Sequence, residues 1–215
     1  MSEGALISLE TKKASKVKSV CCLLDASSSM ASEAEKVQAG VNSLLAMTQL
    51  EAMRLWRRAG IELYLGLGVF PSLTDWNAAL SWNYDLAKNY QTFKYEPKGF
   101  HTPLYEAVDK GIDKLDACHI KGDVVFEIIS DGGNTNSAYI PPKEKVLAKI
   151  AEGWTFIFIG EGIDALNAAE ALGIPAQCRI AAADKAAMIA AQKDLTKRVQ
   201  KYLITGDKLL LTFGG

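Results

Sequence analysis

The sequence predicts one α/β domain with a central, mostly parallel sheet and helices on both faces. At 215 residues the chain is long enough to fill one hydrophobic core. Apolar runs of strand length alternate along it with amphipathic segments of helix length, which is typical of repeated βαβ units. The runs at 20–24 and 123–129 are almost continuously apolar, as expected of strands that are covered on both faces.

The first of these runs ends abruptly in a polar turn. Asp25, Ser27 and Ser29 follow the strand and offer one carboxylate and two hydroxyls at alternate positions. A tight turn can bring these oxygens together, and hard oxygen ligands suit Mg²⁺ or Mn²⁺ better than Zn²⁺. The alternative is that Ser29 or Ser32 caps the next helix.

The next elements follow from periodicity. Apolar residues at helical spacing predict a long helix over 32–58, ended by Gly60. Residues 61–70 predict the second core strand, in which Gly66 and Gly68 indicate close packing against a helix. The segment 76–95 is rich in aromatic residues, and we expect a short antiparallel edge strand near 90–93. These aromatics either cover the sheet edge and a long loop or form a partner surface.

Two polar residues mark the next helix and strand. Thr102 and Pro103 predict a helix that runs to about residue 118, with Thr102 as its N-cap. The strand at 123–129 is followed by Asp131 and two glycines, at the end of a buried parallel strand where open α/β sheets bind their ligands. The alternative for Asp131 is an ordinary Asp-Gly turn.

The rest of the chain continues the alternation. We expect helices over 142–152, 164–172 and 184–202, strands over 154–159 and 178–181, and a last strand over 208–213. The terminal segments 5–9 and 209–213 are short and β-prone, so we expect them to pair with each other, with the sheet edge or with another copy. The chain then divides into an N-terminal extension (1–19), the domain itself (20–204) and a C-terminal tail (205–215).

Three separated motifs resemble the von Willebrand factor A family, whose metal-ion-dependent adhesion site opens with Asp-x-Ser-x-Ser. Asp25, Ser27 and Ser29 carry that pattern, Thr102 ends a Gly-x-x-Thr loop before a helix, and Asp131 is followed by glycine. Ser28 departs from the glycine that the family often has. The resemblance covers 20–181, and residues 153–160 are similar to small stand-alone members of bacteria and their phages. It implies a three-layer, Rossmann-like fold.

The resemblance also implies a function. Ser27, Ser29 and Thr102 would bind Mg²⁺ or Mn²⁺ directly, Asp25 and Asp131 would help through metal-bound waters, and an Asp or Glu of a partner protein would take the open position. These neutral ligands keep the ion electrophilic, which favours binding over catalysis, and we assign no catalytic residue. The alternatives are a metal-assisted phosphoryl-transfer hydrolase and a structural subunit of a phage or other assembly with a vestigial site.

Composition narrows the functional classes. The 24 basic and 25 acidic residues nearly balance, so nothing favours nucleic-acid binding. The sequence has neither a signal-peptide pattern nor 18 consecutive apolar residues, so we expect a cytoplasmic protein that does not enter a membrane.

Cys21 and Cys22 should point to opposite faces of a strand, and we expect all four cysteines to be buried, reduced thiols. His101 is expected to lie exposed at the rim of the site rather than to act as a base.

Overall fold

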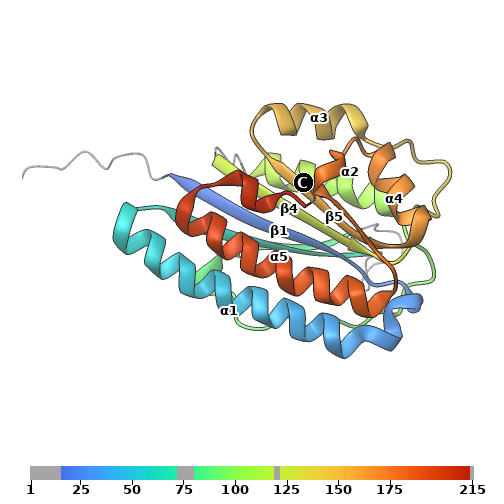
Figure 1. Cartoon of the computed structure of the whole chain (residues 1–215), viewed down its shortest axis with the longest axis horizontal. Coiled ribbons are helices and arrows are strands. Elements are labelled where there is room, and N and C mark those ends of the chain that lie inside the picture. Colours follow the sequence, from blue (N-terminus) through green and yellow to red (C-terminus); the bar gives the residue numbers. More distant parts are fainter. Residues whose placement is uncertain (1–15, 72–79, 119–121, 214–215) are drawn as a thin grey trace, which may run out of the picture.

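The computed structural model describes residues 16–71, 80–118 and 122–213 and confirms the predicted fold class. Its sheet has six strands in the order β3-β2-β1-β4-β5-β6, all parallel to their neighbours except the edge strand β3 (Figure 1). The strands are β1 (Val17–Asp25), β2 (Glu62–Phe70), β3 (Ser81–Leu86), β4 (Gly122–Ser130), β5 (Thr155–Glu161) and β6 (Arg179–Ala182).

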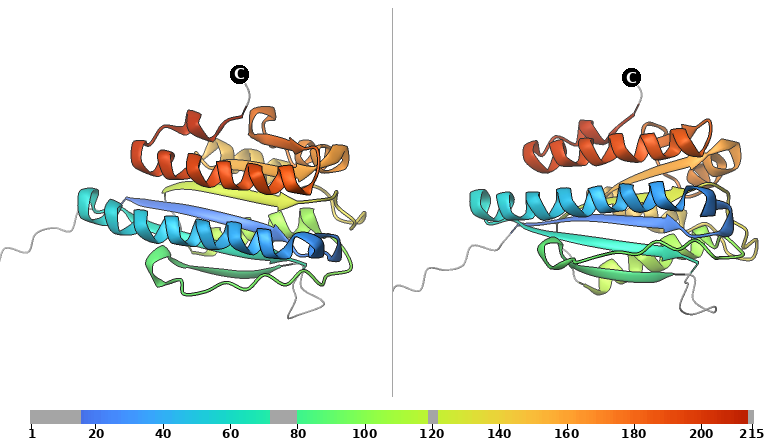
Figure 2. Two further views of the ribbon diagram at one scale, coloured as in Figure 1. Left: turned by 60° about the horizontal axis from the view of Figure 1, so that its bottom comes forward. Right: turned by 90° about the horizontal axis from the view of Figure 1, so that it is seen from below.

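Helices cover both faces of this sheet. The long helices α1 (Ala34–Ala59) and α5 (Lys185–Thr205) lie side by side over one face, as both views in Figure 2 show. The other face is covered by α2 (Leu104–Ala117), α3 (Lys143–Ala151) and α4 (Gly162–Ala171). Short 3₁₀ turns complete the described chain: η1 (Ser28–Glu33), η2 (Ala87–Asn89), η3 (Ala176–Cys178) and η4 (Lys208–Leu211).

The core is therefore double, with one apolar layer on each side of the sheet. Cys22 belongs to the layer under α1 and α5, and Cys21 belongs to the layer under α2, α3 and α4, so the prediction for this pair is confirmed. Because β1 needs apolar side chains on both faces, its sequence shows no alternation. Cys178 is buried, but Cys118 is exposed where α2 ends, so the expectation of four buried thiols is wrong for Cys118.

The antiparallel edge strand is β3, not the predicted segment near 90–93. Trp82 and Tyr84 are half-buried against the sheet while Asn83 and Asp85 are exposed, which is the alternation of a strand covered on one face. The prediction for 90–93 was based on the many aromatic residues of this segment. In the structure, Tyr90 is buried in the loop and its OH donates a hydrogen bond to the Asn83 carbonyl at 2.6 Å.

The close packing at Gly66 and Gly68 is against side chains of the neighbouring strands β1 and β3 rather than against a helix, and the atom nearest to a Cβ added at Gly68 would be Leu23 Cδ2 of β1. A Cβ added at Gly66 would lie 2.8 Å from the Trp82 ring, and one added at Gly68 would lie 2.7 Å from the same ring. The two glycines therefore leave room for the Trp82 indole against β2. The predicted reason for these glycines is wrong, although the expectation of close packing is right.

The C-terminal tail does not form the predicted strand over 208–213. Its first part is the 3₁₀ turn η4, in which the Asp207 side chain accepts from the Leu209 amide at 3.0 Å, so the backbone coils instead of extending. Phe213 then donates its amide to the Gln177 carbonyl at 2.6 Å, beside the start of β6. Residues 5–9 lie outside the described part of the chain, and their pairing stays a prediction. No described helix combines the length and apolar character needed to cross a membrane.

Candidate metal site

The polar turn after β1 lies where the strand order of the sheet reverses. From β1 the chain continues to β2 and β3 on one side, and it returns to β4 on the other side. β1 and β4 run parallel in register up to Leu24 and Ile129, so the residues that follow them emerge together. Such a switch point leaves a crevice at the carboxyl ends of the strands, where open α/β sheets bind ligands.

Asp25 is completely buried at the carboxyl end of β1. Its Oδ1 accepts from the Ser27 amide at 2.8 Å and its Oδ2 accepts from the Ser130 hydroxyl at 2.5 Å. The Tyr95 hydroxyl donates to the Asp25 backbone carbonyl. Burial raises the pKa of Asp25, and the hydrogen bonds from Ser130 and Ser27 oppose that rise. A nearby cation would therefore stabilise the ionised carboxylate.

A chain of hydrogen bonds connects the turn after β1 to the end of β4. The hydroxyls of Ser27 and Ser29 lie 2.9 Å apart, and the Ser29 hydroxyl donates to Asp131 Oδ1 at 3.0 Å. Together with the bond between Asp25 and Ser27, this brings four of the five predicted site residues into one group of oxygens.

The fifth residue, Thr102, lies in a segment held between the same two turns. Gly99 forms a parallel bridge with Ser27, accepting from the Ser28 amide at 2.7 Å and donating to the Ala26 carbonyl at 2.8 Å. Three residues later, the Thr102 amide donates to the Thr135 hydroxyl at 2.7 Å, and the Thr135 amide returns a bond to the Thr102 carbonyl at 2.9 Å. Thr102 is buried, and its side chain makes no hydrogen bond to any described residue.

Thr102 is not the helix cap that the sequence predicts. The cap position of α2 is taken by Pro103, without a side-chain hydrogen bond, and the helix begins at Leu104. The first bond of the helix is donated by the Ala107 amide to the Pro103 carbonyl at 2.9 Å, so Thr102 lies one residue before the cap position. The hydroxyl of Thr102 is consequently not used by the helix.

Solved structures share this fold, whereas no family model and no curated protein sequence matches the chain. The open conformation of the pilus adhesin SpaC from Lactobacillus rhamnosus GG aligns with a TM-score of 0.64 and 14% identity over 89% of this chain. A von Willebrand factor type A protein from Catenulispora acidiphila aligns with a TM-score of 0.54 and 14% identity over 86%.

The chain has the von Willebrand factor A fold. The manganese-loaded TRAP protein of Plasmodium vivax also shares it, with a TM-score of 0.51 and 18% identity over 92% of this chain. The chain spans 31% of SpaC, 43% of the Catenulispora protein and 74% of TRAP, so it corresponds to only part of the first two. At these identities the likeness establishes the fold alone.

Two residues that the sequence analysis missed complete the site in this von Willebrand factor A fold. Ser130 donates to Asp25 from the end of β4, and Lys185, the first residue of α5, places its Nζ 2.9 Å from Asp131 Oδ2. Ser130 was detectable as a hydroxyl directly before Asp131 at the strand end. No sequence signal marks Lys185, because it is one of many lysines and reaches the site from a helix near the other end of the chain.

The donor set fits a small, hard divalent cation. The strand ends bring together two carboxylates, Asp25 and Asp131, and the hydroxyls of Ser27 and Ser29. The segment that carries Thr102 is joined to the same turn by the bridge between Gly99 and Ser27. Within the described ranges, no three histidine, cysteine, aspartate or glutamate side chains gather into a metal-binding cluster. The oxygen set therefore suits Mg²⁺ or Mn²⁺, which accept hydroxyl and water ligands, better than a thiolate- or imidazole-bound metal. His101 is exposed, as expected for a residue at the rim.

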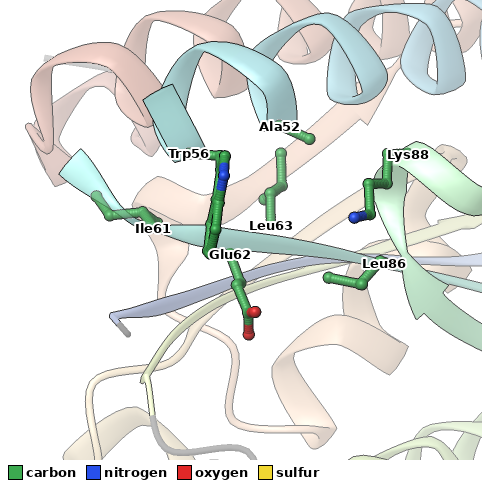
Figure 3. A pocket seen from close by; sticks show the side chains of 7 residues that line it. All are labelled: Ala52, Trp56, Ile61, Glu62, Leu63, Leu86 and Lys88. Carbon is green, nitrogen blue, oxygen red and sulfur yellow. The ribbon is translucent and has the colours of Figure 1, made fainter. Parts of the chain in front are cut away.

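A second hollow lies at the opposite end of β2 and differs in chemistry. This pocket of about 70 Å³ is formed where α1 ends, and it is lined by Ala52, Trp56, Ile61, Glu62, Leu63, Leu86 and Lys88 (Figure 3). Its walls are mainly apolar, and the half-exposed Trp56 indole forms one side. Its one carboxylate and one ammonium do not form a group of converging oxygens like that at the switch point.

Proposed function

We propose that the protein is a metal-dependent protein-binding module of adhesion type. Mg²⁺ or Mn²⁺ is held by the hydroxyls of Ser27, Ser29 and Thr102, with Asp25 and Asp131 supporting the ion. The observation that carries this proposal is a chain of hydrogen bonds that connects Asp25, at the end of β1, to Asp131, just beyond β4, at the switch point. It runs through the Ser27 backbone amide and then through the hydroxyls of Ser27 and Ser29.

The same donors define what the ion would recognise. Hydroxyl ligands bring no charge, and both oxygens of Asp25 already accept hydrogen bonds from the protein. An ion in this setting keeps much of its positive charge and a position that a carboxylate can fill. We therefore propose that an Asp or Glu of a partner protein completes the coordination.

Exposed apolar side chains near the crevice supply contact area around the ion. Phe100 follows Gly99 in the loop before Thr102 and is 83% exposed. Ile163, at the start of α4, is 67% exposed and precedes Asp164, whose Cβ would lie 3.6 Å from a Cβ added at Gly133. Such a rim around a charged centre is typical of protein-binding surfaces.

This rim replaces the aromatic segment as the expected partner surface. Tyr90 and Tyr95 are almost completely buried, and Trp82 lies over Gly66 and Gly68. Trp82, Tyr90 and Tyr95 therefore fit the first of the two expectations for the segment 76–95, a cover over the sheet edge and the loop, whereas Trp76 lies outside the described residues.

The structural neighbours support a binding role. SpaC is a pilus adhesin and the TRAP structure is loaded with manganese, and none of the three neighbours is named as an enzyme. Within the described part of the chain, no hydroxyl of the site is paired with a histidine that would activate it as a nucleophile. A hydrolase therefore has less support than a binding module.

The test combines metal binding with recognition of acidic peptides. Mn²⁺ binding is measured by the loss of the free-ion electron paramagnetic resonance signal, with Mg²⁺ as competitor. A peptide array then compares Asp and Glu peptides with their Asn and Gln counterparts, in Mg²⁺ and in chelator. We expect one Mn²⁺ per chain and metal-dependent capture of the acidic peptides only.

Asp25→Asn is the informative variant because it keeps the shape of the buried side chain while removing its charge. We expect Mn²⁺ affinity to fall by about 100-fold. Asp194→Ala, which removes an exposed aspartate of α5, is the control and should bind as wild type does. Equal Mn²⁺ binding by wild type and Asp25→Asn would overturn the assignment of the site.

A further inference from the structure

Lys185 contacts the candidate metal site, although it belongs to none of the three sequence motifs that predict this site. Its Nζ lies 2.9 Å from Asp131 Oδ2 and also donates to the Ser29 backbone carbonyl. The other carboxylate oxygen of Asp131 accepts from the Ser29 hydroxyl at 3.0 Å. The Asp131 side chain is only 5% exposed and that of Lys185 is 25% exposed, so this ion pair is partly shielded from solvent.

The place of Lys185 in its helix makes this contact informative. It is the first residue of α5, where the helix dipole is positive and a cation is disfavoured. The same helix end is capped in the usual way by Asp184, whose side chain accepts from the Ala187 amide at 2.7 Å. The helix therefore gains nothing from a lysine at this position, and the favourable interactions of Lys185 come from Asp131 and Ser29.

We propose that Lys185 is the internal counter-cation of the metal site, which neutralises Asp131 in the metal-free protein and competes with the divalent ion for it. This inference rests on the proposed function. With Asp25 and Asp131 ionised, the crevice carries a net charge of −1 in the presence of Lys185 and of −2 without it. A divalent cation binds more tightly to the more negative site, so Lys185 weakens metal binding.

The competition has a consequence for the protein without metal. Asp25 and Asp131 are both shielded from solvent, and two such carboxylates repel each other when no cation lies between them. The ammonium reduces this repulsion and keeps the turn after β1, the end of β4 and the start of α5 together. Lys185 thus stabilises the empty site, whereas the metal stabilises the filled one.

The experiment compares Lys185→Met with Lys193→Met in the full chain. Lys193 is exposed on the same helix and makes no hydrogen bond or ion pair within the described residues, so its removal changes the total charge equally without touching the site. Mn²⁺ affinity is measured by electron paramagnetic resonance, and thermal unfolding is followed in chelator.

We expect Lys185→Met to bind Mn²⁺ about tenfold more tightly than Lys193→Met. In chelator, the midpoint of thermal unfolding should be lower for Lys185→Met than for Lys193→Met. Lys185→Arg, which restores the cation, should return the affinity towards that of wild type.

The possible outcomes separate this inference from the proposed function. Mn²⁺ binding of equal strength, or weaker binding by Lys185→Met, would overturn the role of Lys185 while leaving the metal site in place. If neither wild type nor the two methionine variants bind Mn²⁺, the proposed function fails and the inference fails with it.

Discussion

Asp25 and Glu127 are both buried carboxyl groups on the two central strands, but they differ in the hydrogen bonds that they accept. Asp25 ends β1, and both of its oxygens accept hydrogen bonds, from the Ser27 amide and the Ser130 hydroxyl. Glu127 lies in the middle of β4, paired in register with Cys22, and its Oε1 accepts no hydrogen bond from any described residue. Burial raises the pKa of Glu127 from its ordinary value of 4.5 to about 8.

The difference shows why the candidate site lies at the end of the sheet. In mid-strand, the backbone amides are consumed by pairing with both neighbouring strands, so Glu127 finds no spare donor. Where a strand ends, the next amide and the turn hydroxyls are free to turn towards a carboxylate, as they do around Asp25. A buried carboxylate can be kept ionised and offered to a cation only where such donors exist.

The largest expected effect comes from neutralising Glu127. In the folded protein the carboxyl keeps its proton up to about pH 8, whereas in the unfolded chain it ionises near 4.5. The free energy of unfolding of wild type should therefore fall as pH rises from about 4.5 to about 8 and level off above that range. Glu127→Gln lacks this loss and should be more stable than wild type by several kcal/mol near pH 8, on the order of the shift in pKa.

Chemical denaturation of wild type and Glu127→Gln across this pH range measures the effect. Glu144→Gln, which removes an exposed carboxyl of α3, is the control and should follow the wild-type profile. Parallel profiles for wild type and Glu127→Gln would contradict the difference between the two carboxyl groups.

A smaller effect is expected when Asp25 loses one of its donors. Ser130→Ala removes the hydroxyl that donates to Asp25 Oδ2, which makes Asp25 more like Glu127. We expect a loss of about 1.5 kcal/mol in the free energy of unfolding, as for a buried hydrogen bond to a charged group. Because the pKa of Asp25 should rise further, this loss should grow as pH increases.

Denaturation in chelator at several pH values checks this expectation for Ser130→Ala. Mn²⁺ affinity should also fall by about tenfold, since Asp25 is less well held. Ser137→Ala, at an exposed position in the loop after the same strand, should leave stability and affinity unchanged. If Ser130→Ala also left stability and Mn²⁺ affinity unchanged, the hydrogen bond from Ser130 would not stabilise the ionised form of Asp25.

The smallest effect on stability is expected at Thr102. Its hydroxyl neither caps α2 nor bonds to any described residue, so Thr102→Val should change the free energy of unfolding by less than about 0.5 kcal/mol. Because we propose this hydroxyl as a direct metal ligand, Mn²⁺ affinity should nevertheless fall several-fold. Calorimetry and metal titration on the same variant separate the two effects. A large loss of stability with unchanged Mn²⁺ affinity would show that the Thr102 hydroxyl has a structural role and is not a metal ligand.

Much of the molecule follows from the sequence by itself. The continuous apolar run of β1 and the periodicity of α1 reflect which faces are buried, and that information is local. Asp25, Ser27, Ser29 and Asp131 follow strand ends, and in a parallel sheet these ends meet at one edge. The fold class and these four residues of the candidate site therefore follow from the sequence, whereas Ser130 and Lys185 do not.

Tertiary structure decided which partner each of these groups has. Ser29 and Asp131 are 102 residues apart in the chain, Asp25 and Ser130 are 105 apart, and Lys185 and Ser29 are 156 apart. The edge strand β3 was misplaced for a related reason, because the indole of Trp82 fits the surface left by Gly66 and Gly68 on another strand. Periodicity and turn chemistry act over a few residues and fix the elements, whereas the charge balance of the site depends on side chains that only the packed sheet and helices bring together.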